Sequence, residues 1–295
     1  MIKRTSVLLL ALLLALSVFA VGCGGNSDDS DDKADSGDTT TAEDTSLTDI
    51  QEKGTLVLGC DDEFPPMGFV NDDGELTGFD LELAEAVCEK LGVELDAKPI
   101  NWDSKELELT NKNIDVIWNG YSIDADRNKK VEFTKPYLNN QQLIAVKADS
   151  DIKSKADLKD KILGAQIESA AESAVKDDKE FNDSLGELRG YDTYQNALLD
   201  LKGGNRIDAV AGDEILLKYV MQQEPDTFVL LEDSLQDEYY GIGCRQGEVA
   251  LREAIDSALD ELYEDGTVEK ISKKWFDENI VIRDVEKLTQ EDLEG

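Results

Sequence analysis

Beyond its N-terminal region, the chain alternates between short apolar runs and longer stretches whose apolar residues recur every three to four positions. The short runs are rich in β-branched residues and predict strands, whereas the periodic stretches predict amphipathic helices. In the stretch 80–91, for example, Leu83 and Val87 lie on one helix face. Strands that alternate with helices predict an α/β fold with mainly parallel sheets. The predicted strands are 55–60, 93–97, 114–118, 143–147, 162–167, 207–211 and 240–244, and the other predicted helices lie near 169–177, 193–202, 213–222, 247–264 and 266–276.

The N-terminus has the pattern of a secretory signal peptide. Two basic residues precede the apolar run 7–21, which is too short for a comfortable membrane span, and small residues surround Cys23. The sequence A-V-G-C at this point resembles a bacterial lipobox, although Ala20 stands where leucine is usual. We therefore expect residues 1–23 to be a lipoprotein signal peptide that ends at a lipidated Cys23, which anchors the chain to the outer face of a membrane. A plain signal peptide, or an uncleaved anchor, is the alternative.

Residues 24–48 are almost free of side chains that could be buried, and they are rich in aspartate, serine and threonine. Such a segment cannot bury enough apolar surface to fold, so we expect a disordered acidic tether. As a flexible coil it would span roughly 25–30 Å, which lets the domain that follows reorient above a membrane.

Composition argues against several classes of function. Sixty-six acidic residues against 30 basic ones give a formal charge of −36, the wrong sign for a protein that neutralises phosphates, so we expect no nucleic-acid partner. The chain has no histidine, which removes the commonest general base and the commonest transition-metal ligand. Hydrolase and metal-site interpretations therefore lose weight, and we expect neither a metal nor a cofactor.

Three cysteines follow Cys23, namely Cys60, Cys88 and Cys244. An odd number in an exported chain permits at most one disulfide and leaves a free thiol. Burial of all three as small apolar side chains is the alternative, which we favour for Cys88 because it lies on the apolar face of the helix 80–91.

A series of motifs in a fixed order connects these elements. They are D-D-E-F-P-P-M-G-F (61–69), G-E-L-T-G-F-D-L-E-L-A-E-A-V (74–87), N-I-D-V-I-W-N-G-Y-S-I-D-A-D-R (113–127), V-E-F-T-K-P-Y (131–137), G-N-R-I-D-A-V-A-G-D (204–213), Y-G-I-G (240–243) and D-G-T-V-E-K-I-S-K-K-W-F (265–276). Together they resemble the motifs of the polar amino acid-binding proteins that feed bacterial ABC transporters, the family 3 solute-binding lipoproteins.

This resemblance implies a two-lobed periplasmic-binding-protein type II fold, with two mixed sheets flanked by helices. Lobe one would comprise residues 49–143 and 238–295, the latter including a C-terminal tail, and lobe two would comprise residues 144–237. The chain would then cross between the lobes twice and form a double-crossover hinge, so that a ligand in the cleft favours closure through contacts that improve in the closed state.

The resemblance also implies how a free amino acid would be held by its two charged groups. Arg127 matches the arginine that binds the ligand carboxylate, and a guanidinium can do so through two parallel hydrogen bonds. Asp213, directly after the strand 207–211, matches the aspartate that binds the ammonium group. The alternatives are that Arg127 is a surface residue of an acid-rich turn and that Asp213 caps the next helix.

Further positions of the family pattern would complete the site. Phe64 matches an aromatic residue that covers the ligand, and Trp102 stands at another position that contacts the ligand side chain, although both could be core residues. Asn119, Gly120 and Ser122 match the loop whose backbone and hydroxyl groups bind the ligand.

Lobe two departs from the family pattern. Glu168, Ser169 and Ala170 stand where a glycine and two hydroxyl residues are usual, so only Ser169 matches, and it could instead form a capping box with Glu172. A carboxylate at Glu168 would repel an amino acid carboxylate unless it points away or meets a cation. Asp61 matches an acid that can face a basic ligand side chain, which slightly favours a polar or cationic amino acid; Asp61 could also merely orient its loop.

The function that this resemblance implies is capture of a free L-amino acid by a monomeric receptor that delivers it to an ABC permease. Two alternatives stay open. One is an enzyme on the same fold, similar to cyclohexadienyl or arogenate dehydratases, and the other is a ligand-sensing module without transport.

Overall fold

The computed structural model describes residues 43–204 and 206–294. The predicted signal peptide with Cys23 and most of the predicted tether lie outside these described residues. Within them, no helix is both long enough and apolar enough to cross a bilayer.

The first described helix, α1 (Ser46–Lys53), begins inside the range predicted as tether. Its start is held by α8 (Val249–Glu264): Asp44 Oδ2 accepts a hydrogen bond from the backbone of Ala250 at 2.6 Å, and Ser46 Oγ accepts one from Leu251 at 3.1 Å. The first N–H groups of a helix have no partner within that helix. Here these N–H groups belong to α8, and Asp44 and Ser46, in the range predicted as tether, supply the acceptors.

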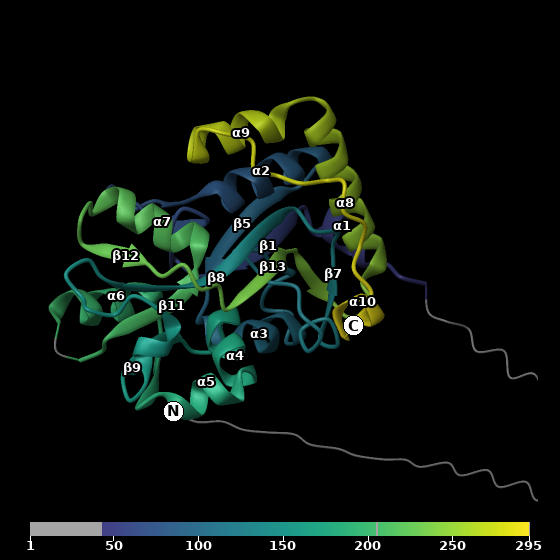
Figure 1. The fold of residues 1–295 in the computed structure, drawn as a ribbon. Coiled ribbons are helices and arrows are strands. Elements are labelled where there is room, and N and C mark those ends of the chain that lie inside the picture. The colour runs from purple at the N-terminus through teal and green to yellow at the C-terminus, as the bar shows by residue number, and fades with distance from the viewer. Residues whose placement is uncertain (1–42, 205, 295) are drawn as a thin grey trace, which may run out of the picture. The chain divides into compact units, whose positions relative to one another are not determined.

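The first sheet has the strand order β5-β1-β6-β14-β7. Its strands β5 and β1 lie side by side in Figure 1. β1 is parallel to β5 and β6, whereas β14 is antiparallel to β6 and β7, so the sheet is mixed. Helices α2, α8 and α9 pack against one another beside it, and we call this sheet and its helices lobe one. The bounds are β1 (Thr55–Cys60), β5 (Glu94–Pro99), β6 (Val116–Ile117), β7 (Val131–Phe133), β14 (Gly243–Arg245), α2 (Phe79–Leu91) and α9 (Thr267–Phe276).

The second sheet has the order β10-β9-β11-β8-β12, with β13 also paired to β8. Alternate residues of β8 face opposite sides, so Ile144 and Val146 pack with helices α4 and α5, whereas Leu143 and Ala145 pack with α6 and α7. We call this sheet and its helices lobe two. The bounds are β8 (Leu138–Lys147), β9 (Ile162–Gln166), β10 (Glu187–Tyr191), β11 (Ala209–Asp213), β12 (Phe228–Leu230), β13 (Gln236–Tyr240), α4 (Ala170–Asp177), α5 (Lys179–Ser184), α6 (Tyr194–Gly203) and α7 (Glu214–Gln223).

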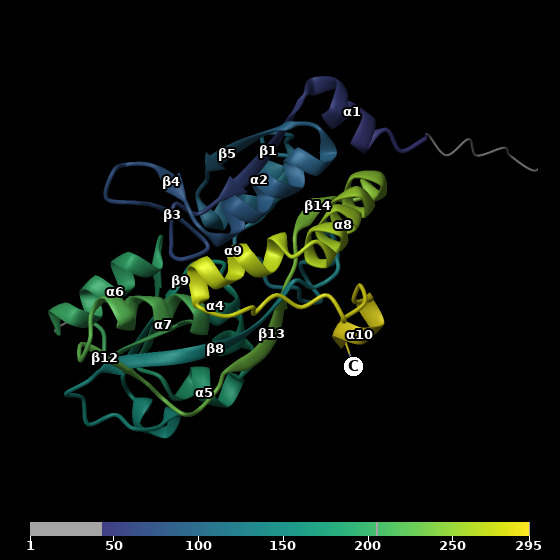
Figure 2. The same ribbon diagram turned by 90° about the horizontal axis from the view of Figure 1, so that it is seen from above.

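Two antiparallel strands connect the lobes. Residues 138–142 of β8 pair with residues 236–240 of β13, and Tyr240 also bridges Ser122 of lobe one (Figure 2). The chain therefore passes between the lobes twice, through a pair of hydrogen-bonded strands.

Several short elements were not predicted from the sequence, because two- to six-residue segments carry too little periodicity to identify. They are β2 (Glu63–Phe64), β3 (Gly68–Val70), β4 (Leu76–Thr77), α3 (Lys105–Thr110), α10 (Gln290–Glu294) and the 3₁₀ turns Trp102–Ser104 and Lys155–Leu158, together with β7, β10, β12 and α5, whose bounds are given above. The single strand predicted at 240–244 is divided between β13 and β14.

The three cysteines are free and buried. Burial raises the pKa of the Cys60 and Cys88 thiols to about 12, and it also raises that of Cys244. They fill the core as small apolar side chains, and the disulfide that their number permits is not formed.

We predict that Gly78 cannot be replaced without disturbing the start of α2. Its φ of +150° lies in a region that essentially only glycine adopts, and a Cβ there would lie 2.2 Å from the carbonyl oxygen of Met67. Gly78→Ala should lower the free energy of unfolding by at least about 2 kcal/mol. Gly74→Ala is the matched control: Gly74 also has a positive φ, but no atom lies within 4 Å of the added Cβ, so a loss of about 1 kcal/mol is expected. Equal losses in urea unfolding would contradict the steric argument.

Candidate ligand-binding site

All nine ligand-binding residues predicted from the sequence line one cavity of about 260 Å³ between the lobes. Three lining residues, Gln166, Ala170 and Tyr194, were missed by the sequence analysis. The predicted residues in the lining are Asp61, Phe64, Trp102, Asn119, Gly120, Ser122, Arg127, Ser169 and Asp213.

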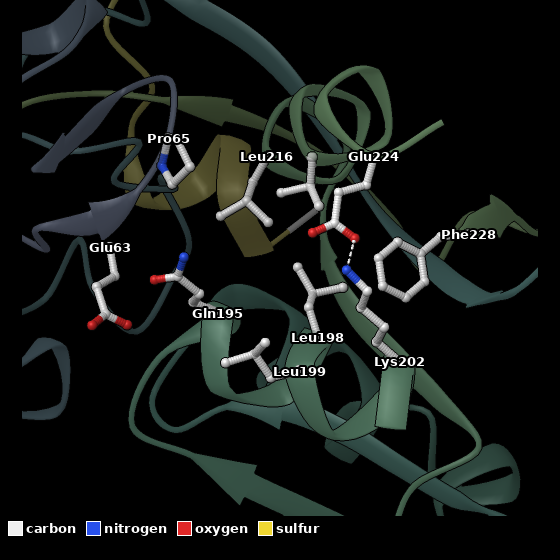
Figure 3. Close-up of a pocket in the computed structure, with 10 residues that line it drawn as sticks. Glu63, Pro65, Gln195, Leu198, Leu199, Lys202, Leu216, Glu224 and Phe228 are labelled. Carbon is white, nitrogen blue, oxygen red and sulfur yellow. Dashed lines mark hydrogen bonds and ion pairs between the residues drawn. The ribbon is translucent and has the colours of Figure 1, made fainter. Parts of the chain in front are cut away.

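A second pocket, of about 470 Å³, is more apolar and contains none of these nine residues (Figure 3). Side chains of α6 and α7 form most of its wall, including Leu198 and Leu216, and Lys202 pairs with Glu224 at 2.6 Å along one side. Among the described residues that line this pocket, Lys202 is the only cation, and it is already neutralised by Glu224. The described lining therefore lacks the paired free charges that a zwitterion requires.

Arg127 is buried, contrary to the alternative of a surface arginine. Its Nε lies 3.3 Å from an oxygen of Asp124, its Nη1 donates to the carbonyl of Ser122 at 3.1 Å, and the guanidinium lies 4.8 Å from the ring centre of Tyr121. Its Nη2 donates across the cleft to the carbonyl of Glu168 at 3.0 Å. A guanidinium carries five N–H donors, so two remain for another acceptor.

Asp213 lies opposite, at the end of β11. Its Oδ1 accepts hydrogen bonds from Asn140 at 2.9 Å, Gln142 at 2.8 Å and the hydroxyl of Tyr240 at 2.5 Å. The side chain does not cap α7, so the capping alternative is not seen in the structure. Burial raises the pKa of Asp213, because its charge is removed from water.

A second buried carboxylate, Glu238, lies behind Asp213 and was missed by the sequence analysis. Its Oε1 accepts from the side-chain amides of the same Asn140 and Gln142, each at 2.7 Å, so each amide bridges two carboxylates. Burial, and then the charge of Asp213, raise the pKa of Glu238 to about 8, against the opposing charge of Arg127. The surrounding sequence Q-D-E-Y-Y gives no signal that this glutamate is buried.

The loop 119–122 is fixed from beneath by Asp80. This fully buried carboxylate accepts from the backbone N–H of Gly120 at 2.8 Å and from the hydroxyl of Tyr137 at 2.9 Å. Burial raises the pKa of Asp80 to about 7. Gly120 has a φ of +57°, and a Cβ there would lie 2.9 Å from the ring of Phe64, so a side chain at this position would enter the cavity wall.

Asp61 and Gln166 connect the lobes on another side of the cavity. Gln166 Nε2 donates to Asp61 Oδ2 at 2.6 Å, while Asp61 Oδ1 accepts from the backbone of Glu63 at 2.8 Å. Asp61 therefore does orient its loop, and it also faces lobe two. Burial raises the pKa of Asp61 to about 6. The rings of Phe64 and Tyr194 approach across the same cleft, with centres 5.8 Å apart.

The departure in lobe two has a structural explanation. Ser169 Oγ accepts a hydrogen bond from the backbone N–H of Glu172 and so caps α4. In a capping box the Glu172 carboxylate would accept from the N–H of Ser169, but here it accepts from the N–H of Glu168. The predicted capping box is therefore displaced by one residue. Glu168 has a φ of +57°, the left-handed region that favours the glycine usual in the family. Its side chain is exposed and does not line the cavity, so the expected repulsion is avoided.

An acidic chamber adjoins the cavity. It is a space of about 590 Å³ that shares Asp61 and Trp102 with the cavity and is further lined by Asp62, Asp103 and Asp192. In the described part of the chain, these last three carboxylates form no ion pair. The chamber therefore presents uncompensated negative charge to any part of a ligand that extends from the cavity into it.

Comparison with known proteins identifies the family. Residues 56–278 match the model of the bacterial extracellular solute-binding proteins, family 3. The L-cystine-binding protein TcyJ of Escherichia coli K12 is 33% identical over 80% of this chain and 87% of its own length. The ABC transporter arginine-binding protein 1 of the same strain is 33% identical over 74% of this chain and 89% of its own.

A solved structure agrees with these relatives. The substrate-binding protein of an ABC uptake transporter from Streptococcus pneumoniae, with bound histidine, superimposes with a TM-score of 0.79 at 35% identity, over 82% of this chain and all of that one. The predicted resemblance and the two-lobed type II fold are thus confirmed. The chain belongs to family 3 of the bacterial extracellular solute-binding proteins.

Proposed function

We propose that this protein captures a free cationic amino acid outside the cytoplasm and delivers it to an ABC permease. One observation carries the proposal: Arg127 of lobe one and Asp213 of lobe two, which have opposite charges, line the same cavity. A zwitterion can satisfy both at once and so favours the closed state of the cleft. Membership of an extracellular solute-binding family supports the location and the role in uptake.

Each end of the zwitterion has a complement in the cavity. The two remaining N–H groups of Arg127 suit a carboxylate, and the first N–H groups of α4, beside Ser169, would add donors of the same kind. Asp213, with Glu238 behind it, suits an ammonium group.

The acidic chamber supports a cationic ligand side chain. A guanidinium or ammonium that passes Asp61 would meet Asp62, Asp103 and Asp192. A relative that binds arginine fits this charge. Cystine, which the name of another relative specifies, would instead place a second ammonium and a second carboxylate there, so its far end is neutral overall and gains less from these aspartates than a guanidinium does.

The attachment of the protein to its membrane is part of the proposal. Cleavage before Cys23 and lipidation of that cysteine would hold a monomeric receptor near its permease, with the acidic tether as the connection. Mass spectrometry of the mature N-terminus tests this, because an unmodified Cys23 would exclude the lipid anchor.

Binding without chemistry is the interpretation that we prefer over an enzyme on the same fold. The carboxylates of the site are engaged by neighbouring amide, hydroxyl or backbone donors, which suits charge recognition. Turnover of prephenate or arogenate by the purified protein would overturn this interpretation, and an amino acid that binds and stays unchanged supports it over the dehydratase.

The first prediction about binding concerns the two charges that hold the zwitterion. In calorimetric titration of the chain without its signal peptide, arginine should bind, and Arg127→Ala or Asp213→Ala should weaken binding by about 2–5 kcal/mol, because each leaves a desolvated ligand charge unpaired. Arg189→Ala is the control: Arg189 pairs with Glu187 and does not line the cavity, so its affinity should be unchanged. Normal affinity in both cavity variants would place the site elsewhere.

The second prediction concerns ligand selectivity. The double variant Asp103→Asn with Asp192→Asn should weaken arginine binding about tenfold, because it removes two of the charges that face the ligand side chain. Binding of glutamine, whose side chain is neutral, should not weaken. A parallel loss for both ligands would mean that the aspartates stabilise the fold and do not select the ligand.

The third prediction concerns proton release. A ligand ammonium beside Asp213 and Glu238 favours their charged forms, and the pKa of Glu238 is raised to about 8 in the free protein. Binding should therefore expel a proton below this pH, so affinity should rise between pH 6 and pH 8. Titration in two buffers of different ionisation enthalpy measures the released proton. Glu238→Gln should reduce the release, and unchanged release in this variant would assign the proton to another group.

A further inference from the structure

Lys105 is a fully buried lysine that the proposed binding of a zwitterion does not use. It begins α3, its side chain is 1% exposed, and it is not among the residues that line the cavity. Its Nζ donates to the carbonyl of Trp102 at 3.1 Å and lies 3.6 Å from a carboxylate oxygen of Glu106. An ammonium group removed from water is costly, so its remaining contact is informative.

That remaining contact crosses the cleft. Lys105 Nζ donates to the backbone carbonyl of Glu168 in lobe two at 3.1 Å, and the same carbonyl accepts from Arg127 Nη2 at 3.0 Å. Two cations of lobe one therefore converge on one carbonyl oxygen of lobe two. The left-handed conformation of Glu168 sets the direction of this carbonyl, and Glu172 holds the N–H of the same residue at 3.0 Å.

We propose that Lys105 is a positioning residue for ligand capture, which acts by holding the Glu168 carbonyl in the closed cleft. This inference rests on the proposed function and assigns to it a residue that does not touch the ligand. Opening of the cleft separates Lys105 from this carbonyl, so the bond stabilises only the closed state. While it holds, Lys105 keeps the carbonyl in place for Arg127, whose other N–H groups then stay directed at the ligand carboxylate.

The nearby charges fit this role. Lys105 and Arg127 repel each other, and this repulsion together with burial lowers the pKa of Lys105 to about 8. Glu106 offsets both cations and is itself held by the hydroxyl of Tyr121 at 3.0 Å. The Glu168 carbonyl is thus the group through which lobe two helps to offset the positive charges of Lys105 and Arg127.

The test uses Lys105→Met in the chain without its signal peptide, because methionine fills a similar volume without charge. With arginine as the ligand, stopped-flow kinetics should show a dissociation rate raised about ten- to a hundredfold and an association rate changed less than twofold. Small-angle scattering should show a larger radius of gyration at saturating ligand. Lys98→Met is the matched control, since Lys98 pairs with Glu108 of the same lobe, and its rates should be normal.

The outcomes separate the two proposals. An unchanged dissociation rate in Lys105→Met, with or without a lower melting temperature, overturns the positioning role and leaves the receptor function intact. If the wild-type protein binds no amino acid, the receptor function fails and the role of Lys105 in ligand capture is overturned with it. Scattering of the ligand-free proteins then tests the contact across the cleft by itself, because a more open Lys105→Met would show that this contact holds the lobes together. Should the methionine variant not fold, Lys105→Gln, which retains a donor, should give a smaller increase of the same rate, and no increase overturns the role.

Discussion

The burial of the Arg127 guanidinium is the constraint on which the site depends. A charge taken out of water must have its donors met, and here they are met from three directions: Asp124 and a carbonyl of its own lobe, and the Glu168 carbonyl across the cleft. Each partner fixes the plane of the guanidinium, so the two remaining donors point in a fixed direction. A ligand carboxylate would complete this set, and closure of the lobes and recognition of the ligand then depend on the same side chain.

Asp213, which carries the opposite charge, is hydrogen-bonded to residues of β8 and β13, the strands that connect the lobes. Asn140 and Glu238 are register partners on β8 and β13, and both are bonded in the network that holds Asp213. An ammonium group that binds Asp213 therefore acts on a network built into the strands between the lobes. The two charged groups of a zwitterion would therefore favour closure in different ways. The carboxylate would act through Arg127 and the Glu168 carbonyl of lobe two, and the ammonium group would act through Asp213 and the connecting strands.

The sequence predicts the fold class from its alternating elements and the family from its motifs, and the nine residues that line the cavity are what the family resemblance implies. The rule that ligands gather at the ends of strands in α/β sheets adds a physical reason for Asp213 alone. What it misses depends on long-range packing. Glu238 and Lys105 have the appearance of surface charges in their own segments, and only the approach of other elements buries them. In the same way, the order at Ser46 arises from contact with Leu251, about 200 residues away in the chain. Glu168 shows the converse case, in which a residue that breaks the family pattern keeps the backbone conformation that the pattern requires.

The excess of acidic residues, which in the sequence argues only against a nucleic-acid partner, acquires a more specific meaning beside the cavity. A chain with a formal charge of −36 attracts cations and repels anions over the distance of a Debye length, and the chamber lined by Asp62, Asp103 and Asp192 concentrates this field at one edge of the cleft. Carboxylate charge is also costly inside the protein, and burial is the main reason why the pKa values of Asp61 and Glu238 are raised. A cationic amino acid relieves this cost at both ends of the cavity, whereas an acidic one would add to it. The proposed selectivity for a cationic ligand would therefore follow from the unfavourable electrostatics of the site itself as much as from any single contact with the ligand.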